Sequence, residues 1–197
     1  MSFQIETPRL IIRDVREDDI PILCKYFTEP ESQSNILSFQ ANEAYNKNEL
    51  EKAMAWAKQS PRPYYKLAVE LKSDGTLIGN CNLSDAVPEG FAANIGWHYG
   101  HRFSGNGYAT EAARALLDFG FEFIGANEIY ADCFADNRAS IRILEKIGMN
   151  SSLDFNLFNI IRGWSYGESK AAVRYTISKY RWREQIERLG ELQRIGD

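Results

Sequence analysis

Two glycines, Gly105 and Gly107, stand one residue apart in the stretch RFSGNGYATEAARALLDFGF, residues 102–121, directly before an alanine-rich amphipathic run. Glycine has no side chain, so the backbone at such positions can approach a bound group closely. The first amides of a helix have no partner inside the helix, and the helix dipole favours negative charge at that end. The spacing therefore predicts an anion-binding loop that leads into a helix.

Two nucleotide-binding patterns do not fit this loop. A dinucleotide-binding loop needs a third small residue at its sixth position, where this chain has Thr110, and it usually opens the first βαβ unit. A P-loop needs Gly-Lys followed by Ser or Thr, whereas Gly107 is followed by Tyr108. A tight turn with close packing is the alternative that the two glycines leave open.

Composition narrows the classes of function. The chain has 197 residues, of which 44% are hydrophobic and 25% charged, and its net charge is −4. An acidic balance argues against a nucleic-acid partner, because nucleic-acid binders normally carry a basic face. The first residues, MSFQIETPRL, lack the apolar stretch of a signal peptide, and no run is long enough to span a membrane. We therefore expect a cytoplasmic protein without a nucleic-acid or membrane partner.

The cysteines and histidines do not form a metal-binding pattern. Cys24, Cys81 and Cys133 are widely separated and include no CxxC pair, and the chain has only two histidines, His98 and His101. A structural zinc site is therefore not expected, and no metal is predicted as a cofactor. Scattered cysteines of odd number are typical of reduced, buried thiols in the cytosol.

Hydrophobic periodicity indicates the elements that must position the loop. A period of two predicts strands, and a period near 3.6 with capping residues predicts helices. The predicted strands cover residues 8–15, 65–71, 77–83, 93–100, 128–134, 155–162 and 171–180. The predicted helices cover residues 18–29, 43–59, 109–123 and 137–147, with Asn137 as an N-cap and Gly125 and Gly148 just past helix ends. This order predicts an α/β fold with a mixed sheet.

The end of the chain continues with apolar residues at helical spacing, namely Ile186, Leu189, Leu192 and Ile195. We expect a single domain over residues 1–183 and a helical extension over residues 184–197. The extension could pack on its own domain or on a second copy, so the sequence is compatible with a monomer or a homodimer.

Several stretches, in the same order along the chain, resemble the GNAT superfamily of acetyl-CoA-dependent N-acetyltransferases. The loop Arg102-Phe-Ser-Gly105-Asn-Gly107 resembles the superfamily's [Q/R]-x-x-G-x-[G/A] pyrophosphate loop. GYATEAARALLDFGF and DNRASIRILEKIGM are similar to the Rim-type branch, which includes acetylases of ribosomal-protein N-termini. The N-x-x-S-x-x-x-L-E-K-x-G pattern of this branch is carried by Asn137, Ser140, Leu144, Glu145, Lys146 and Gly148. The resemblance covers about residues 6–150, with TPRLIIRDVREDDIPIL at its start and LIGNCNL and NIGWHYG in its middle.

This resemblance implies the acyl-CoA N-acyltransferase fold, a central and mostly antiparallel sheet that is flanked by helices and splayed at the acetyl-CoA site. It implies acetyl-CoA as cosubstrate, with the pyrophosphate on the amides of residues 103–109. The pantetheine arm would lie along the strand of residues 95–99, opposite residues 129–134. The residues implied to bind acetyl-CoA are Trp97, His98, Tyr99, Arg102, Phe103, Ser104, Gly105, Asn106, Gly107, Tyr108, Ala109, Asn137 and Ser140.

The resemblance also implies catalytic roles for Ser140 and Asn137. Ser140 would donate a proton to the departing thiolate or hold the thioester sulfur, and its place in a first helical turn favours a developing anion. The alternative is that Ser140 only satisfies an amide at the helix start. Asn137 would contact the pantetheine arm and also cap the helix. A main-chain N–H of residues 95–99 would stabilise the oxyanion.

Four residues bear on the general base. Many relatives carry glutamate where this chain has Asn94, and an amide cannot accept the proton. His98 lies on the same strand face by alternation, and its ordinary pKa suits the task, so it is the third predicted catalytic residue. A structural role for His98 is the alternative. Glu111 and Asp132 are further candidates for the base.

The sequence thus predicts transfer of an acetyl group from acetyl-CoA to a primary amine in a ternary complex. No cysteine stands in a recognisable nucleophile setting, which disfavours a covalent acetyl-enzyme. The preferred acceptor is a protein N-terminal α-amine, and a small amine such as an antibiotic or a polyamine is the alternative. A non-catalytic acyl-CoA-binding regulatory module is an alternative from a different class.

Overall fold

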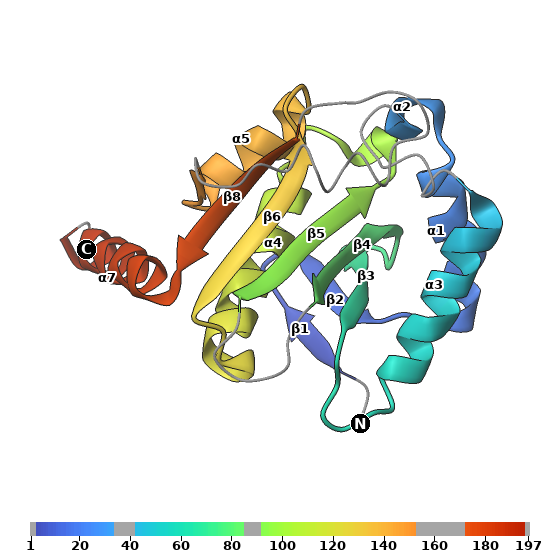
Figure 1. Ribbon diagram of the computed structural model, residues 1–197, viewed down its shortest axis with the longest axis horizontal. Helices are drawn as coiled ribbons and strands as arrows, with labels where there is room; N and C mark the ends of the chain where they lie inside the picture. Colours follow the sequence, from blue (N-terminus) through green and yellow to red (C-terminus); the bar gives the residue numbers. More distant parts are fainter. Residues whose placement is uncertain (1–2, 34–41, 85–91, 153–171, 196–197) are drawn as a thin grey trace.

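The computed structural model describes residues 3–33, 42–84, 92–152 and 172–195, and its central feature is an eight-stranded sheet (Figure 1). The strands lie in the order β1-β2-β3-β4-β5-β6-β8-β7. β5 and β6 are parallel, and the other neighbours are antiparallel. The strands are β1 Gln4–Glu6, β2 Leu10–Asp14, β3 Tyr65–Leu71, β4 Leu77–Ser84, β5 Ala92–Tyr99, β6 Glu128–Phe134, β7 Asn150–Ser151 and β8 Ala172–Ser178. The predicted mixed, mostly antiparallel sheet is confirmed.

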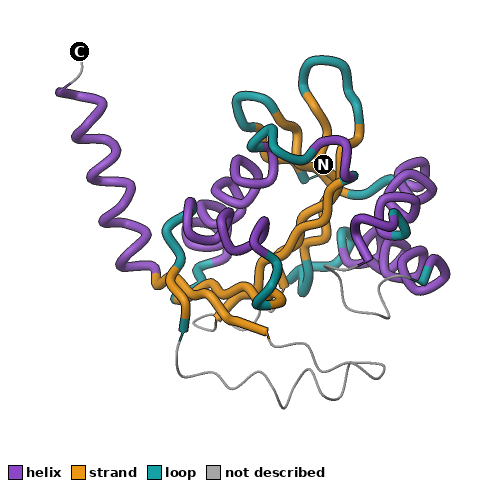
Figure 2. Tube along the Cα trace, turned by 90° about the horizontal axis from the view of Figure 1, so that it is seen from above, coloured by secondary structure: helices purple, strands orange, loops and turns teal. Residues whose placement is uncertain are grey.

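Helices cover both faces of the sheet, as the view from above shows (Figure 2). The α-helices are α1 Ile20–Phe27, α2 Pro30–Gln33, α3 Glu43–Trp56, α4 Tyr108–Phe119, α5 Arg138–Lys146 and α7 Lys179–Ile195. Short turns of 3₁₀-helix occur at Glu17–Asp19 and His101–Phe103, and a π-helical turn follows α4 at Gly120–Ile124. α1 and α3 pack on one face, and α4 and α5 pack on the other.

Each face of the sheet has its own core because side chains along a strand alternate between the faces. Leu67 and Val69 of β3 belong to the larger core beneath α4, whereas Ala68 between them belongs to the smaller core beneath α1 and α3. β3 is therefore apolar on both sides, as expected for a strand that is covered by helices on both faces. Lys66 of the same strand is also buried, at 9% exposure, although it carries a charged group.

β5 and β6 separate along their length, and this separation shapes the middle of the sheet (Figure 1). Their ladder runs only from Ala92–Asn94 to Glu128–Tyr130. Asn94 lies at the last pair, where its side-chain amide donates to the Tyr130 carbonyl at 3.4 Å. Beyond this point β6 pairs only with β8 among the described residues, so the edge of β5 from residue 95 to 99 has no strand partner there.

Most predicted elements are confirmed, with shifted ends. The strand predicted at residues 8–15 is β2, and the prediction missed β1, which is only three residues long. The helix predicted at residues 43–59 ends at Trp56. The three predicted cap residues are found: Gly125 ends the π-helical turn with φ +82°, Gly148 follows α5 with φ +86°, and the side chain of Asn137 caps α5. The strand predicted at residues 155–162 lies outside the described residues.

The last helix begins earlier than predicted, and residues of its first two turns contact the rest of the domain, including Gln185, which donates to the Gly148 carbonyl at 3.2 Å. α7 begins at Lys179, so the predicted boundary after residue 183 falls inside one helix. Trp182 is buried, packs on Phe121 with ring centroids 5.1 Å apart, and donates its indole N–H to Asp118 at 2.8 Å. Towards its C-terminal end the helix projects away from the sheet (Figure 2). Among the described residues, none of the helices has the length and apolar character needed to cross a bilayer.

Candidate active site

The glycine loop joins β5 to α4 and holds two residues in left-handed conformation. Gly105 has φ +80° and Gly107 has φ +79°, a region that residues with a side chain rarely adopt. Nothing lies within 4 Å of the position where a Cβ would stand on Gly105. The glycines thus permit the left-handed backbone conformation, and the absence of a side chain on Gly105 leaves open space beside the loop. Gly107 is also the N-cap residue of α4.

Three consecutive main-chain amides of this loop are unpaired within the part of the chain that the structure describes. Among the described residues, none accepts a hydrogen bond from the N–H groups of Gly105, Asn106 or Gly107. The side-chain amide of Asn106 instead donates to the carbonyls of Phe103 at 3.1 Å and Ser104 at 3.2 Å, which closes the loop on itself. The first amides of α4 follow directly and have no acceptor in a preceding turn. Such a cluster of amides at a helix N-terminus is suited to bind phosphate groups.

A carboxylate in the first turn of α4 joins this helix to the turn between β1 and β2. Glu111 accepts hydrogen bonds from the Thr7 hydroxyl at 2.6 Å, the Arg9 main-chain N–H at 2.8 Å and the Arg9 Nε at 2.6 Å. Arg9 also donates from Nη1 to the Asn106 carbonyl at 3.0 Å. Burial would raise the pKa of Glu111, but these hydrogen bonds and the Arg9 charge lower it below its ordinary value. Glu111 therefore holds the loop in place and is poorly suited to accept a proton.

Asp132, the other carboxylate considered as a base, is also engaged. Its two oxygens accept from Nε and Nη2 of Arg174, each at 2.7 Å. The pair links neighbouring residues of β6 and β8. Both oxygens of Asp132 are thus occupied by the Arg174 guanidinium in a bidentate ion pair.

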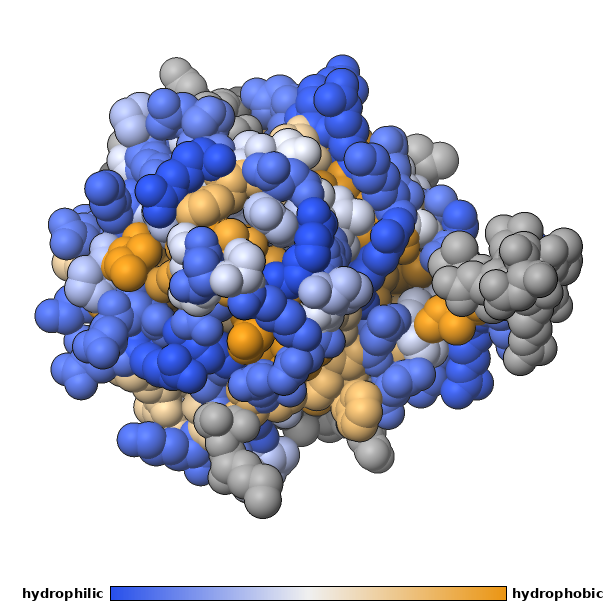
Figure 3. Space-filling model, turned by 180° about the vertical axis from the view of Figure 1, so that it is seen from behind, coloured by the Kyte–Doolittle hydropathy of each residue, from blue (hydrophilic) through white to orange (hydrophobic). Residues whose placement is uncertain are grey.

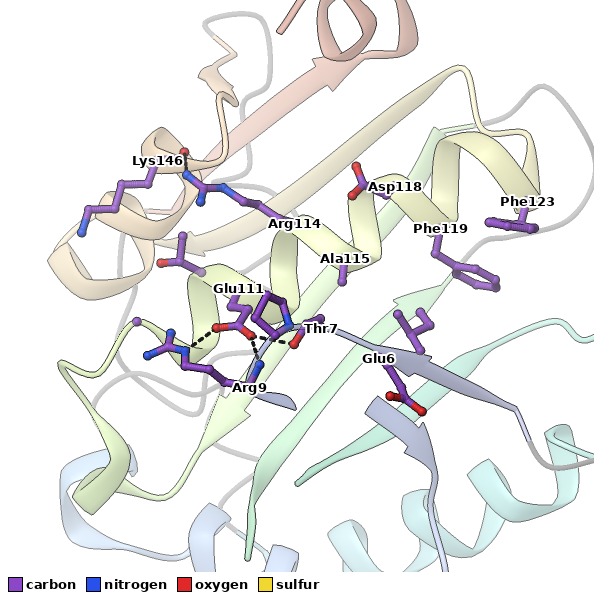
Figure 4. A pocket seen from close by; sticks show the side chains of 14 residues that line it. Glu6, Thr7, Arg9, Glu111, Arg114, Ala115, Asp118, Phe119, Phe123 and Lys146 are labelled. Carbon is purple, nitrogen blue, oxygen red and sulfur yellow. Dashed lines mark hydrogen bonds and ion pairs between the residues drawn. The ribbon is translucent and has the colours of Figure 1, made fainter. Parts of the chain in front are cut away.

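A groove of about 810 Å³ runs along the outer side of α4 from Gly107 to Phe123 (Figure 4). Its other wall is the turn between β1 and β2, including Thr7 and Arg9. Arg114 also lines it and donates to the Lys146 carbonyl at 3.1 Å. Of the residues predicted to bind acetyl-CoA, only Gly107 lines this groove. The molecular surface seen from behind is mainly hydrophilic, with separate apolar groups (Figure 3).

The predicted residues of β5 divide between the two faces of the sheet. Trp97 and Tyr99 pack against the larger core on the α4 side. The Tyr99 hydroxyl is buried and has no hydrogen-bond partner among the residues that the structure describes, and burial raises its pKa well above the ordinary value. His98 points to the opposite face, where α1 covers the sheet. Alternation along a strand requires this division, so these three side chains cannot meet in one pocket.

His98 is held firmly by α1. Its ring stacks on Phe27 with centroids 4.5 Å apart, and its Nε2 lies 2.9 Å from the Tyr26 carbonyl oxygen. A carbonyl only accepts, so Nε2 carries the proton and Nδ1 of the neutral ring carries the lone pair. Burial lowers the pKa of His98 below its ordinary value. The imidazole is thus a neutral group with one nitrogen available as a proton acceptor.

Asn137 and Ser140 meet at the start of α5. The Asn137 side-chain oxygen accepts from the Ser140 main-chain N–H at 3.0 Å, and Asn137 is buried. Asn137 therefore caps the helix, and the cap uses the backbone of Ser140 and not its hydroxyl. The Ser140 side chain is half-buried, in the first turn of the helix that follows β6.

The other predicted loop residues lie around the glycines. Arg102 donates from Nη2 to the Tyr26 hydroxyl at 3.3 Å and covers the Phe103 ring with its guanidinium carbon 4.6 Å from the ring centroid. The Arg9 guanidinium lies over the ring of Tyr108 at 4.7 Å. Ser104 donates its main-chain N–H to the carbonyl of His101. Ala109 follows Tyr108 in the first turn of α4.

Sequence reasoning missed two residues that build this region, Arg9 and Tyr26. Each pairs with loop residues more than 70 positions away, so no local spacing reveals them. The arginine stands in the stretch TPRLIIRDV, where alternation indicated only a strand. A charged residue at the start of a buried strand was the available signal.

The described residues contain no group of three histidine, cysteine or acidic side chains that could hold a metal ion. Cys24 and Cys81 are buried, and Cys133 is partly buried, all as free thiols. Burial raises the pKa of each thiol, for Cys133 to about 11. The thiols are therefore protonated and unreactive as nucleophiles at neutral pH.

Comparison with known proteins gives a consistent match. A family model described as acetyltransferase (GNAT) domain matches residues 9–150. The chain is 27% identical over 175 residues to the uncharacterized N-acetyltransferase p20 of Bacillus licheniformis, covering 87% of this chain and 93% of that protein. The structure resembles that of an acetyltransferase (GNAT family) from Bacillus anthracis, with a TM-score of 0.74, 25% identity and coverage of 90% and 99% of the two chains. It also resembles the spermidine N-acetyltransferase from Vibrio cholerae in complex with CoA and spermine, with a TM-score of 0.71, 16% identity and coverage of 89% and 99%.

Proposed function

The chain belongs to the GNAT acetyltransferase family, and we propose that it transfers the acetyl group of acetyl-CoA directly to a primary amine within a ternary complex. The observation that carries this proposal is the loop of residues 103–109. In the described ranges of the chain, the amides of Gly105, Asn106 and Gly107 have no acceptor. Both glycines hold left-handed conformations, and a Cβ on Gly105 would meet open space. A diphosphate supplies the acceptors that these amides lack.

The other groups that we propose for binding acetyl-CoA lie along β5, where this strand separates from β6. The edge of β5 from Ile95 to Tyr99 has main-chain groups without a strand partner among the described residues. The amide groups of a pantetheine arm could pair with such an edge as an added strand does. Asn137 and Ser140 lie beyond the end of β6, the strand on the other side of the separation. We therefore assign acetyl-CoA to the residues that the resemblance implied.

In this assignment each group has a stated task. A main-chain N–H of β5 stabilises the oxyanion, and the Ser140 hydroxyl donates a proton to the thiolate that leaves. His98 accepts the proton of the incoming amine through Nδ1, directly or through water, because its Nε2 is occupied by the Tyr26 carbonyl. The three protonated thiols support direct transfer over an acetyl-enzyme.

The acceptor is a protein N-terminal α-amine or a small amine. An α-amine with a pKa of about 7.7–8.0 needs only about 1 kcal/mol to become neutral at pH 7, whereas a lysine-like amine needs about 4–5 kcal/mol. A single histidine as proton acceptor is compatible with the smaller free energy that deprotonation of an α-amine requires. The Rim-type resemblance of the DNRASIRILEKIGM stretch also favours a protein N-terminus.

The test is to incubate the protein with acetyl-CoA and a panel of peptides and small amines while free thiol is measured. We expect thiol release that depends on both the amine and the protein. Calorimetric titration with acetyl-CoA is run in parallel. Tight binding without thiol release on any acceptor would instead support the non-catalytic acyl-CoA-binding module.

A further inference from the structure

The C-terminal end of α1 meets the end of β5 and the start of the glycine loop. Tyr26, in the last turn of α1, is 4% exposed and makes separate contacts there with its carbonyl, its ring and its hydroxyl. Glu29 adds a contact from the same end of the helix, because its carboxylate accepts the main-chain N–H of His101 at 2.7 Å. The end of α1 is therefore fixed to the segment from residue 98 to residue 103.

The main-chain carbonyl of Tyr26 orients the ring of His98. The last carbonyls of a helix have no partner within the helix, so this oxygen is available to a donor from another element. Nε2 of His98 lies 2.9 Å from it and therefore carries the proton of the neutral ring. The ring also stacks on Phe27, at 4.5 Å between centroids. Both the position of the imidazole and the choice of its protonated nitrogen thus depend on the end of α1.

The side chain of Tyr26 holds the start of the glycine loop. Its hydroxyl donates to the Leu77 carbonyl at 2.9 Å, which leaves the hydroxyl oxygen to accept from Nη2 of Arg102 at 3.3 Å. Its ring packs edge to face against Phe103, with centroids 6.1 Å apart and an interplanar angle of 81°. The Arg102 guanidinium in turn covers the Phe103 ring. Two of the residues predicted to bind acetyl-CoA are therefore held by one tyrosine.

Gly100 shows how closely the tyrosine ring is fitted to this segment. Its φ of −56° and ψ of 134° are values that residues with a side chain adopt freely. A Cβ on Gly100 would nevertheless lie 2.8 Å from both Cδ1 and Cε1 of Tyr26, which is closer than real Cβ contacts. The ring of Tyr26, and not the backbone conformation, therefore requires glycine at this position.

We propose that Tyr26 is a positioning residue of the transferase: its carbonyl sets the protonated nitrogen of His98, and its side chain holds Arg102 and Phe103 where the loop receives the diphosphate. This inference rests on the proposed acetyl transfer. Tyr26 contacts neither the acetyl group nor the amine in this assignment and acts only through these three residues. One residue of α1 thus aligns the proton acceptor with the phosphate-binding loop.

The hydroxyl is tested by Tyr26→Phe, which retains the ring and the main-chain carbonyl. We expect Kd for acetyl-CoA to rise about 2- to 10-fold, because Arg102 loses its anchor and has to be immobilised on binding. The value of kcat should stay unchanged, because the contact of the carbonyl with His98 remains. Tyr175→Phe is the matched control, since Tyr175 is a buried tyrosine of β8, at 8% exposure, and should bind acetyl-CoA as the parent chain does. An unchanged Kd in Tyr26→Phe, a fall in its kcat, or an equal rise of Kd in Tyr175→Phe would overturn the proposal.

The carbonyl is tested by NMR of the histidine rings, which requires no turnover. At about pH 7.5, above the ordinary pKa of histidine, two-bond ¹H–¹⁵N spectra should show His98 as a neutral ring with its proton on Nε2. The chain has only two histidines, so His101→Gln assigns the signals. The Nε2–H form should persist in Tyr26→Phe. A proton on Nδ1 of His98 in the parent chain would overturn the proposal.

Gly100→Ala tests both contacts together, because its Cβ displaces the Tyr26 ring. The fraction of the Nε2–H form should fall, Kd for acetyl-CoA should rise further than in Tyr26→Phe, and kcat should decrease. A folded Gly100→Ala protein with the parent's His98 signals and Kd would contradict the proposal. If this variant does not fold, the parent chain and Tyr26→Phe still test the carbonyl and the hydroxyl.

These results can be separated from those for the transferase itself. Thiol release together with a parent-like Kd in Tyr26→Phe would leave the proposed function standing and remove the role of Tyr26. Absence of thiol release on every amine, with a raised Kd in Tyr26→Phe and the Nε2–H form in the parent chain, would retain the positioning by Tyr26 and remove the proposed reaction.

Discussion

Replacing Gly105 by alanine tests the phosphate-binding role of the loop with little ambiguity. Gly105 has φ +80°, and a Cβ there meets nothing within 4 Å, so the change adds one methyl group to open space. The left-handed conformation costs alanine about 1–2 kcal/mol. For a chain of this size that corresponds to a fall of roughly 2–8 °C in Tm. The fold itself should persist.

The chain offers a matched control in Gly75, at the turn between β3 and β4. Gly75 has φ +72°, and a Cβ there also meets nothing within 4 Å. Gly75→Ala should therefore lower Tm by a similar amount. The two variants share the backbone strain and differ in position relative to the proposed phosphate site. Gly107→Ala adds a second test, since its Cβ would have only ordinary contact with Arg9, at 3.4 Å.

Affinity for acetyl-CoA should distinguish the two loop variants from the Gly75→Ala control. A methyl group that displaces one charge-assisted hydrogen bond between a loop amide and a phosphate costs about 1.5–3 kcal/mol. This predicts a rise in Kd of about 10- to 150-fold for Gly105→Ala and Gly107→Ala, measured by calorimetric titration. Gly75→Ala should bind as the parent chain does. Equal Kd values for all four proteins, or an equal loss in Gly75→Ala, would refute the assignment of the loop.

Two further predictions concern the catalytic candidates. Ser140→Ala should lower kcat roughly 10²-fold or more while Kd for acetyl-CoA and Tm remain unchanged, because the cap of α5 uses the Ser140 backbone; steady-state kinetics that match the parent chain would exclude the proton-donor role. Burial lowers the pKa of His98 below 6.5, so between these two values the unfolded chain binds a proton that the folded chain does not. Stability from this group is complete above pH 6.5 and is lost as pH falls towards the lowered pKa. Urea unfolding at about pH 7.5 and about pH 5.5 should show a smaller pH-dependent loss in His98→Gln than in the parent chain, and an equal loss would contradict this reasoning.

The replacement of the common glutamate by Asn94 has a structural counterpart. The Asn94 amide donates to the Tyr130 carbonyl where the β5–β6 ladder ends, and a carboxylate could not donate this hydrogen bond. Asn94 therefore joins β5 to β6 at the last pair of their ladder, and the strands separate beyond it. In the reaction that we propose, the proton acceptor is therefore another residue, and our proposal is His98, which lies on the same face of β5.

Features that depend on neighbours within a few positions could be predicted from the sequence. The Gly105-Asn-Gly107 loop, the start of α4 at Tyr108 and the capping of α5 by Asn137 involve contacts over one to four residues. Their physical basis is the conformation of single residues and the unpaired amides of a helix start, which local residue types specify. The alternation along β5 likewise predicted that Trp97 and His98 face opposite sides.

Only the tertiary structure showed what each face of the sheet meets. His98 finds the Tyr26 carbonyl 72 positions away, and Glu111 finds Arg9 102 positions away. Lys66 is not distinguished in the sequence, yet packing beneath α1 and α3 makes it a buried cation. Periodicity predicts which residues of a strand share a face. Which helices and side chains pack on that face depends on the order of the strands and on helix packing, and these are set by contacts between distant parts of the chain. The sequence by itself thus specified the local conformation of the loop and the helix caps, and the folded chain decided which distant side chains pair with one another.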